Sequence, residues 1–169
     1  METYYTEEIA RDPNTSPDIL KKILEQGNDD SISIYASENP NCPSYLLEIV
    51  LKRGNSDYVS RNAASNPNCP ASALEMILKR GNNDSVSHYA AINPNCPPQA
   101  LVEVLKQGNN DFVSLFASKN PNCPALAKIE WMKLTGKIGK FDPSIHIMET
   151  EIIYKEDPDL QKLRDLINE

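Results

Sequence analysis

The sequence predicts an all-α protein, a solenoid of about five 27-residue repeats of two helices each, followed by a C-terminal tail. Three observations predict it. The motif Asn-Pro-Asn-Cys-Pro starts at residues 39, 66, 93 and 120, always 27 residues after the previous copy, and a weaker copy starts at Asp12. Between copies the apolar residues follow the helical period. A glycine-to-aspartate turn then divides each repeat in two, as expected for units that bury their apolar faces only against their neighbours.

The composition favours a protein or peptide partner. The chain has 169 residues, 40% of them hydrophobic, which suffices for one domain whose core is shared between neighbouring repeats. A formal net charge of −7 repels phosphate backbones over the surface as a whole. Nucleic acid is therefore not the expected partner, although a local basic strip on the surface would allow it.

Three segments are predicted along the chain. Residues 1–11 form an N-terminal cap that includes a short helix, 12–136 form the repeat solenoid, and 137–169 form a C-terminal tail or cap. The first residues lack the basic start and apolar core of a secretory signal, and no apolar run approaches the roughly 20 residues that span a bilayer. We expect a cytoplasmic protein without a membrane partner.

The first helix of each repeat is predicted to start at the second proline of the motif. Pro43 suits the first helical position because its missing N–H would have no partner there, and this places Cys42 at or near the N-cap. Glu48 and Lys52 form a favourable i,i+4 pair on the outer side. Gly54 ends the helix, since glycine adopts the left-handed C-cap conformation without steric cost. The apolar side consists of Leu46, Leu47, Val50 and Leu51.

The second helix is shorter. Asp57 is placed to cap a helix over residues 58–65, and the aspartates at the equivalent positions are expected to do the same. Val59 and Ala63 are four residues apart, so they share one face, which we assign to the core. The Asn-Pro step that follows ends the helix, because a residue before proline avoids the α region.

The fifth copy departs from the pattern, and the tail follows it. Lys128 replaces a leucine found in the other four copies, and Thr135 replaces the capping glycine. In the tail, residues 145–154 look extended, and an amphipathic helix is predicted to start at Asp157. This helix either covers the open end of the last repeat or docks onto another subunit or partner.

With these features the chain resembles the leucine-rich repeat variant family, a relative of HEAT-like α-solenoids. The matching features are Asn-Pro-Asn-x-Pro, the leucine of the first helix and Val-x-x-x-Ala-x-x-Asn in the second, over about residues 12–135. The resemblance implies a right-handed superhelix whose short second helices, α or 3₁₀, line the concave side. The chain departs from the family in its longer period, in a serine where arginine often follows the valine, and in cysteine for threonine at the motif.

Cysteines and histidines do not predict a metal or cofactor site. Some members of the family hold an iron–sulfur centre on four N-terminal cysteines, but no cysteine precedes Asp12 here. Equivalent positions of stacked helices lie about 8–10 Å apart, too far for a disulfide, so we expect a ladder of separate thiols at Cys42, Cys69, Cys96 and Cys123. Alternatively, the helix N-terminus lowers the thiol pKa and gives the ladder a redox or metal-linked role. His88 and His146 lack a metal-binding pattern, and no catalytic motif is found.

The candidate binding surface is a stripe on the second helices. Core positions there are alike in every copy, whereas positions on the opposite side differ, and spacings of three and four place them on one side of each helix. Aromatic residues and arginine are typical of interaction hot spots. An equally weighted alternative is that several of them pack between repeats. The predicted stripe comprises Ile34, Tyr35, Tyr58, Arg61, His88, Tyr89, Ile92, Phe112, Leu115 and Lys119.

These observations predict a non-enzymatic module that binds or scaffolds a protein or peptide through its second helices and uses no cofactor. The nucleic-acid alternative depends on basic residues that recur on the first helices, where they alternate with acidic ones: Lys52, Arg53, Lys79, Arg80 and Lys106.

Overall fold

The computed structural model describes residues 5–137, and within them the chain forms ten α-helices and no strand. The prediction of an all-α protein is confirmed. The helices are α1 (Glu7–Arg11), α2 (Pro17–Glu25), α3 (Ser31–Glu38), α4 (Ser44–Lys52), α5 (Tyr58–Ser65), α6 (Ala71–Lys79), α7 (Ser85–Ile92), α8 (Pro98–Lys106), α9 (Phe112–Lys119) and α10 (Ala125–Leu134).

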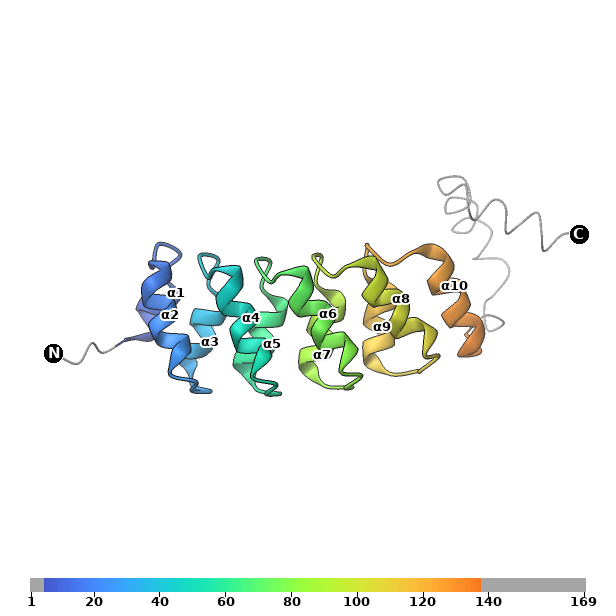
Figure 1. The fold of residues 1–169 in the computed structure, drawn as a ribbon, viewed down its shortest axis with the longest axis horizontal. Coiled ribbons are helices and arrows are strands. Elements are labelled where there is room, and N and C mark those ends of the chain that lie inside the picture. Colours follow the sequence, from blue (N-terminus) through green and yellow to red (C-terminus); the bar gives the residue numbers. More distant parts are fainter. Residues whose placement is uncertain (1–4, 138–169) are drawn as a thin grey trace, which may run out of the picture.

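The helices form two rows that run side by side along an elongated body (Figure 1). The even-numbered helices are the first helices of the repeats, and each contacts the next even-numbered one. The odd-numbered helices contact one another in the same serial way, and each second helix also packs on the first helix of its own repeat. The core therefore runs the length of the array between the two rows. The right-handed superhelix stays a prediction.

The core columns predicted from the sequence are buried. The leucine column of the first helices (Leu20, Leu47, Leu74, Leu101) has no exposed surface, and Val59 and Ala63 of α5 are 2% and 0% exposed. In the fifth repeat Lys128 occupies the leucine column and is half-buried, whereas Trp131, in the column of Val104, is 3% exposed. Its indole N–H donates to the Asn109 carbonyl at 2.7 Å, so this large side chain is satisfied inside the core.

The first helices start one residue later than predicted at four of the five repeats. The N-caps of α4, α6, α8 and α10 are Pro43, Pro70, Pro97 and Pro124, with ψ between 138° and 146°. That backbone is extended, so the proline precedes the first helical residue and Cys42 lies outside the helix. In α2 the N-cap is Ser16, which lies 27 residues before Pro43, and Pro17 is the first helical residue, as Pro98 is in α8.

The predicted caps of the second helices are confirmed. The side chains of Asp30, Asp57, Asp84 and Asp111 each accept a hydrogen bond from the backbone N–H three residues later, at 2.7–2.8 Å. All four helices that follow, α3, α5, α7 and α9, are α-helical.

The glycine that follows each first helix has a positive φ, as predicted; for Gly54 φ is +80°. The last repeat also has a glycine with positive φ after its first helix. Thr135 is the C-cap of α10, and Gly136, one residue later, has φ +67°. The loss of the capping glycine predicted at Thr135 is therefore wrong, because α10 is one residue longer and the glycine moves with its end.

The short helix predicted near the N-terminus is present as α1, which packs on α3 as α3 packs on α5, and the assignment of residues 1–11 as a cap stays a prediction. Helix α1 occupies the place of a second helix at the start of the array. The predicted extended stretch at 145–154 and the helix from Asp157 lie outside the described residues. Within residues 5–137, none of the helices is long and apolar enough to cross a membrane.

Candidate interaction surface

Two asparagines of each motif join neighbouring repeats. In the third copy, Asn66 is 2% exposed, and its side-chain amide donates to the carbonyls of Ser37 (2.8 Å) and Asn39 (3.2 Å) in the preceding repeat. Its oxygen accepts from the backbone N–H of Asn68 at 2.8 Å. Because Ser37 lies in the last turn of α3, this amide caps the C-terminus of the preceding second helix. The same bonds recur at Asn39, Asn93 and Asn120.

The second asparagine of the motif forms a parallel series. The Asn68 amide donates to the carbonyls of Pro40 (2.7 Å) and Cys42 (3.1 Å), and Asn95 and Asn122 do the same one repeat further on. Together the two series fix the distance and orientation between one second helix and the next. They hold rigid the frame on which the predicted binding stripe lies.

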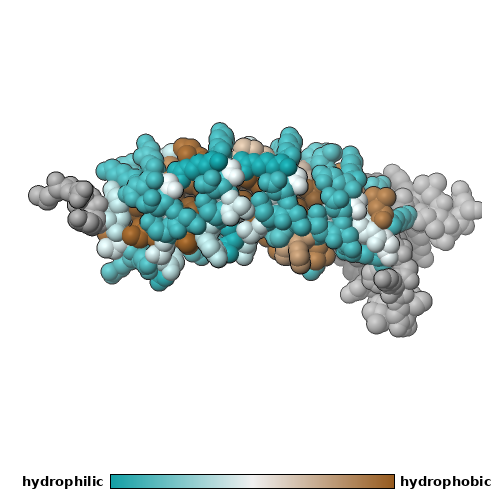
Figure 2. All heavy atoms as spheres, turned by 90° about the horizontal axis from the view of Figure 1, so that it is seen from below, coloured by the Kyte–Doolittle hydropathy of each residue, from teal (hydrophilic) through white to brown (hydrophobic). Residues whose placement is uncertain are grey.

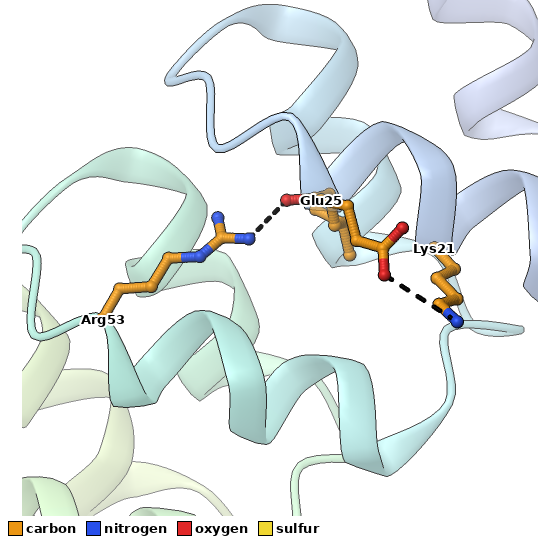
Figure 3. Close-up of polar contacts among 4 residues, drawn as sticks. Lys21, Glu25 and Arg53 are labelled. Atoms are coloured by element: carbon orange, nitrogen blue, oxygen red, sulfur yellow. Dashed lines mark hydrogen bonds and ion pairs between the residues drawn. The ribbon is translucent and has the colours of Figure 1, made fainter.

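Arginines cap the first helices in a similar way. The Arg53 guanidinium at the end of α4 donates to the Leu24 carbonyl in the last turn of α2 at 2.6 Å (Figure 3). Arg80 donates to the Leu51 carbonyl at 2.8 Å. Each repeat in this part of the array therefore caps the carbonyl ends of both helices in the repeat before it.

The cysteines form the predicted ladder of separate thiols. All four are free and buried, at 0–5% exposure. Burial raises the pKa of Cys42, Cys69 and Cys96 from the ordinary 9.0 to about 12, and it also raises that of Cys123. The alternative of a pKa lowered by the helix N-terminus is wrong, because each thiol lies inside the core before the N-cap. Among residues 5–137 no group of histidine, cysteine and carboxylate side chains is arranged to hold a metal ion.

The predicted stripe separates into two groups. Tyr58 (56%), Phe112 (61%), Tyr89 (40%) and Ile92 (44%) are exposed, and Lys119 is exposed as well. A second group, Ile34, Tyr35 and Leu115, is half-buried and packs against the core. Packing between repeats, the alternative weighed from the sequence, thus holds for the second group, whereas the first group is free to contact a partner.

Arg61 and Tyr58 of α5 lie against Tyr89 of α7. The Arg61 Cζ atom is 4.5 Å from the centroid of the Tyr58 ring and 5.7 Å from that of Tyr89. These are cation–π distances, so the two rings hold the half-buried arginine between neighbouring repeats. Arg61 thereby becomes a fixed part of the stripe.

His88 continues the stripe toward α9. Its ring lies 5.7 Å from both Phe112 and Phe116, centroid to centroid, and its Nε2 is 3.0 Å from the Asn83 side-chain oxygen. Contacts therefore join α5 to α7 through Tyr89, and α7 to α9 through His88. We define the aromatic stripe as Tyr58, Arg61, His88, Tyr89, Ile92 and Phe112.

Two contributors were absent from the residues predicted for this surface. Phe116 supports His88, and Arg11 of α1 places its Cζ atom 3.7 Å from the Tyr35 ring centroid. Phe116 occupies the same column as Tyr35 and Tyr89, which was a sufficient signal. Arg11 had none, because only the structure shows that α1 takes the place of a second helix.

The aromatic stripe has a charge unlike that of the whole chain. Helices α5, α7 and α9 contain no aspartate or glutamate, and their charged residues are Arg61 and Lys119; the cap aspartates Asp57, Asp84 and Asp111 directly precede them. Figure 2, which views the array from below, shows a largely hydrophilic surface on which hydrophobic patches are small and separate. The chain thus combines an acidic composition with an aromatic stripe that contains an arginine.

The basic residues of the first helices are occupied. Lys52 pairs with Glu48 at 2.8 Å, Lys79 with Glu75 at 2.6 Å and Lys106 with Glu103 at 3.2 Å. Arg53 and Arg80 bind backbone carbonyls, as described above. These side chains do not form an uncompensated basic strip of the kind that a phosphate backbone requires.

A shallow groove of about 680 Å³ lies along the motif turns, away from the aromatic stripe. Asn41, Asn68 and Asn95 line it together with prolines, and their amides are already engaged in the bonds between repeats. The groove is a consequence of repeat stacking and offers few free polar groups to a ligand.

Comparison of the chain with protein-family models, with curated proteins and with solved structures finds no match.

Proposed function

We propose that the protein is a non-enzymatic binding or scaffold module that holds a protein or peptide partner on the aromatic stripe. One observation carries the proposal: Tyr58, Tyr89, Ile92 and Phe112 are large apolar side chains that stay 40–61% exposed on neighbouring second helices. Exposed aromatic residues with an arginine among them are the residue types that dominate binding energy at interfaces.

The rigid frame beneath the stripe supports the proposal. Each second helix is tied to the next by buried amide hydrogen bonds and by core packing, so the aromatic side chains are held at fixed spacing before a partner arrives. A surface ordered in advance loses less conformational entropy on binding. The arrangement suits recognition of an extended or helical segment over several repeats.

We further propose membership of the leucine-rich repeat variant family on the basis of the repeat motif and the two-helix unit. The serine that departs from the family pattern is buried in every copy, at 1–2% exposure, so it belongs to the core in this chain. We propose a cytoplasmic location, which four free and buried thiols suit. The occupied basic residues weigh against nucleic acid, and the raised thiol pKa values weigh against a redox role.

Affinity capture with quantitative mass spectrometry tests the proposal. The full chain is compared with the double variant Tyr58→Ala/Phe112→Ala, on lysate from cells that produce the protein. Truncation of two hot-spot aromatics is expected to reduce capture of the true partner at least tenfold. Unfolding midpoints are expected to change little, because both side chains are more than half exposed.

A matched control comes from the first helices. Tyr45 and Ile49 of α4 are 48% and 44% exposed, so Tyr45→Ala/Ile49→Ala removes similar apolar surface from the other row of helices. The proposal requires this variant to retain the partner. Equal loss in both variants, or retention in both, would contradict it.

A further inference from the structure

We propose that Arg61 is a carboxylate anchor, so that the segment bound to the aromatic stripe carries an acidic side chain next to apolar ones. This inference rests on the proposed function and names the chemistry of its partner.

The surroundings of Arg61 leave its charge unused. Its Nε atom is buried and has no hydrogen-bond partner among residues 5–137, and no carboxylate of that part of the chain forms an ion pair with it. Arg53 and Arg80, by contrast, donate to backbone carbonyls. The rings of Tyr58 and Tyr89 fix the Arg61 guanidinium without neutralising it. A planar, fixed guanidinium is suited to bidentate recognition of a carboxylate.

The acidic group closest in sequence is already engaged. Asp57 lies four residues before Arg61, but its carboxylate accepts from the Ser60 N–H at 2.7 Å as the cap of α5. No ion pair joins the Asp57 carboxylate to the Arg61 guanidinium. Of the other aspartates at this end, Asp84 and Asp111 cap α7 and α9 in the same manner, and Asp29 accepts from the Val59 N–H of α5 at 3.4 Å. Because no carboxylate of residues 5–137 pairs with the Arg61 guanidinium, it is available to a carboxylate of a partner.

Charge complementarity selects an acidic segment over a basic one. Helices α5, α7 and α9 contain Arg61 and Lys119 and no carboxylate, while the whole chain carries a formal charge of −7. The cap aspartates Asp57, Asp84 and Asp111 keep their negative charge at the N-terminal ends of these helices, so the attraction for an acidic side chain is confined to the Arg61 guanidinium. This places the acidic residue of the bound segment at Arg61.

The stripe also sets the length of the segment. Packed helices lie about 8–10 Å apart, so the path from Arg61 on α5 to Phe112 on α9 covers roughly 16–20 Å. An extended chain rises about 3.3 Å per residue and spans this path in about five or six residues. The bound segment is thus expected to place its acidic residue about five residues from an aromatic or aliphatic one.

Selection from a random peptide library displayed on phage tests the inference on the full chain. Enriched peptides are expected to contain an aspartate or glutamate at that spacing from an apolar residue. The best peptide is then synthesised with its carboxylate intact and with the carboxylate replaced by the amide. Arg61→Gln is expected to weaken the carboxylate peptide at least tenfold and the amide peptide hardly at all, because only the first contacts the guanidinium.

Two variants serve as controls. Lys22→Gln removes an exposed positive charge from α2 in the other row of helices and is expected to leave both affinities unchanged. Arg61→Lys keeps the charge but loses the planar fork, so it should restore only part of the affinity. Urea midpoints of all variants establish that the fold is intact.

The outcomes separate this inference from the proposed function. If Tyr58→Ala/Phe112→Ala abolishes peptide binding but the selected peptides lack a carboxylate, or Arg61→Gln weakens both peptides alike, the anchor is disproved and the binding surface stands. If that double variant binds the peptides as the wild type does, both are disproved. Displacement of the peptide by a single-stranded oligonucleotide at physiological salt would also overturn the inference, in favour of phosphate recognition.

Discussion

The motif turns and the aromatic stripe are separated by only a few residues in the chain, and their side chains meet opposite environments. Asn39, Asn66, Asn93 and Asn120 are 0–2% exposed, and each is bonded to the repeat before it. On the stripe, Tyr58 and Phe112 are 56% and 61% exposed. The turn residues are the same in the four copies that start at residues 39, 66, 93 and 120, whereas the stripe residues change from copy to copy.

The contrast separates what the array needs from what it leaves free. A buried amide that bonds to its neighbour has no acceptable substitute, so the position is identical wherever a joint is made. An exposed side chain has no such constraint and can be fitted to a partner one repeat at a time. Substitutions at the two regions should therefore have opposite consequences for stability and for binding.

The largest loss of stability is expected for Asn66→Ala. It leaves the Ser37 carbonyl and the Asn68 N–H without partners, each at a cost of about 1–3 kcal/mol, and it removes one of the two bonds to the Asn39 carbonyl, which keeps its bond from the Cys42 N–H. The free energy of unfolding should therefore fall by about 3–5 kcal/mol. Urea unfolding followed by circular dichroism measures it. Asn110→Ala, in an exposed turn, is the control and should change little. If both variants lost the same free energy of unfolding, the hydrogen bonds of Asn66 would not be what stabilises the joint between repeats.

A smaller loss is expected for Cys69→Ser. The thiol is fully buried, and a hydroxyl in its place is costlier to remove from water, so we expect a loss of about 1–3 kcal/mol. Thiol reagents test the same burial: with a pKa of about 12, Cys69 should react only when the chain unfolds. Fast reaction of the native protein, or a serine variant as stable as the wild type, would contradict the buried ladder.

The aspartate caps predict that the free energy of unfolding falls in acid. Burial alone raises the pKa of Asp57, but hydrogen bonds from the Ser60 hydroxyl and N–H and from Asn55 outweigh it and hold the pKa below the ordinary 3.8. The cap therefore stabilises the fold at pH values above the ordinary pKa of 3.8, and this contribution is lost as the pH falls through the lowered pKa of the folded state. Asp57→Ala should cost about 1 kcal/mol at pH 7 and much less at pH 2–3, measured by urea unfolding.

Asp57→Asn is the matched control for this cap. It keeps a side-chain oxygen as the acceptor but cannot titrate, so the contribution of this cap should stay constant with pH. A wild-type stability that does not fall between pH 5 and 2 would show that the caps do not act through the charged form.

The smallest loss is expected for Phe112→Ala, within about 0.5 kcal/mol, because an exposed side chain gains little from folding. Leu74→Ala in the buried column, by contrast, should cost about 2–5 kcal/mol. Unfolding curves for the pair provide the measurement. A cost above 1 kcal/mol for Phe112→Ala would assign that ring to packing between repeats and remove it from the binding surface.

Sequence periodicity predicted most of the fold. The helix class, the leucine and Val/Ala columns and the aspartate caps all follow from local chemistry that repeats every 27 residues. The start of the first helices was placed one residue early at Pro43, because proline suits the N-cap and the first helical position alike. Local preference alone does not distinguish these two positions.

Long-range hydrogen bonds were missed. Asn66 was noted as part of a motif, but its partners lie 27 and 29 residues earlier, and nothing local reveals them. Arg53 was grouped with a basic strip, although it caps a helix of the preceding repeat. The division of the stripe into exposed Tyr58 and half-buried Ile34 likewise depends on side-chain packing, which a pattern of spacing does not contain.

The hydrogen bonds of the turns always reach back by the same number of residues, and this has an evolutionary consequence. Removal of residues 66–92 as a block would bring Asn93 opposite the carbonyls of Ser37 and Asn39, the partners that Asn66 has now. Unequal recombination between copies at the gene level can thus shorten or lengthen the protein without damaging a single joint. Each such event would add or remove one second helix and its surface side chains. New binding specificities can thus arise from a change in the number of repeats as well as from point mutation.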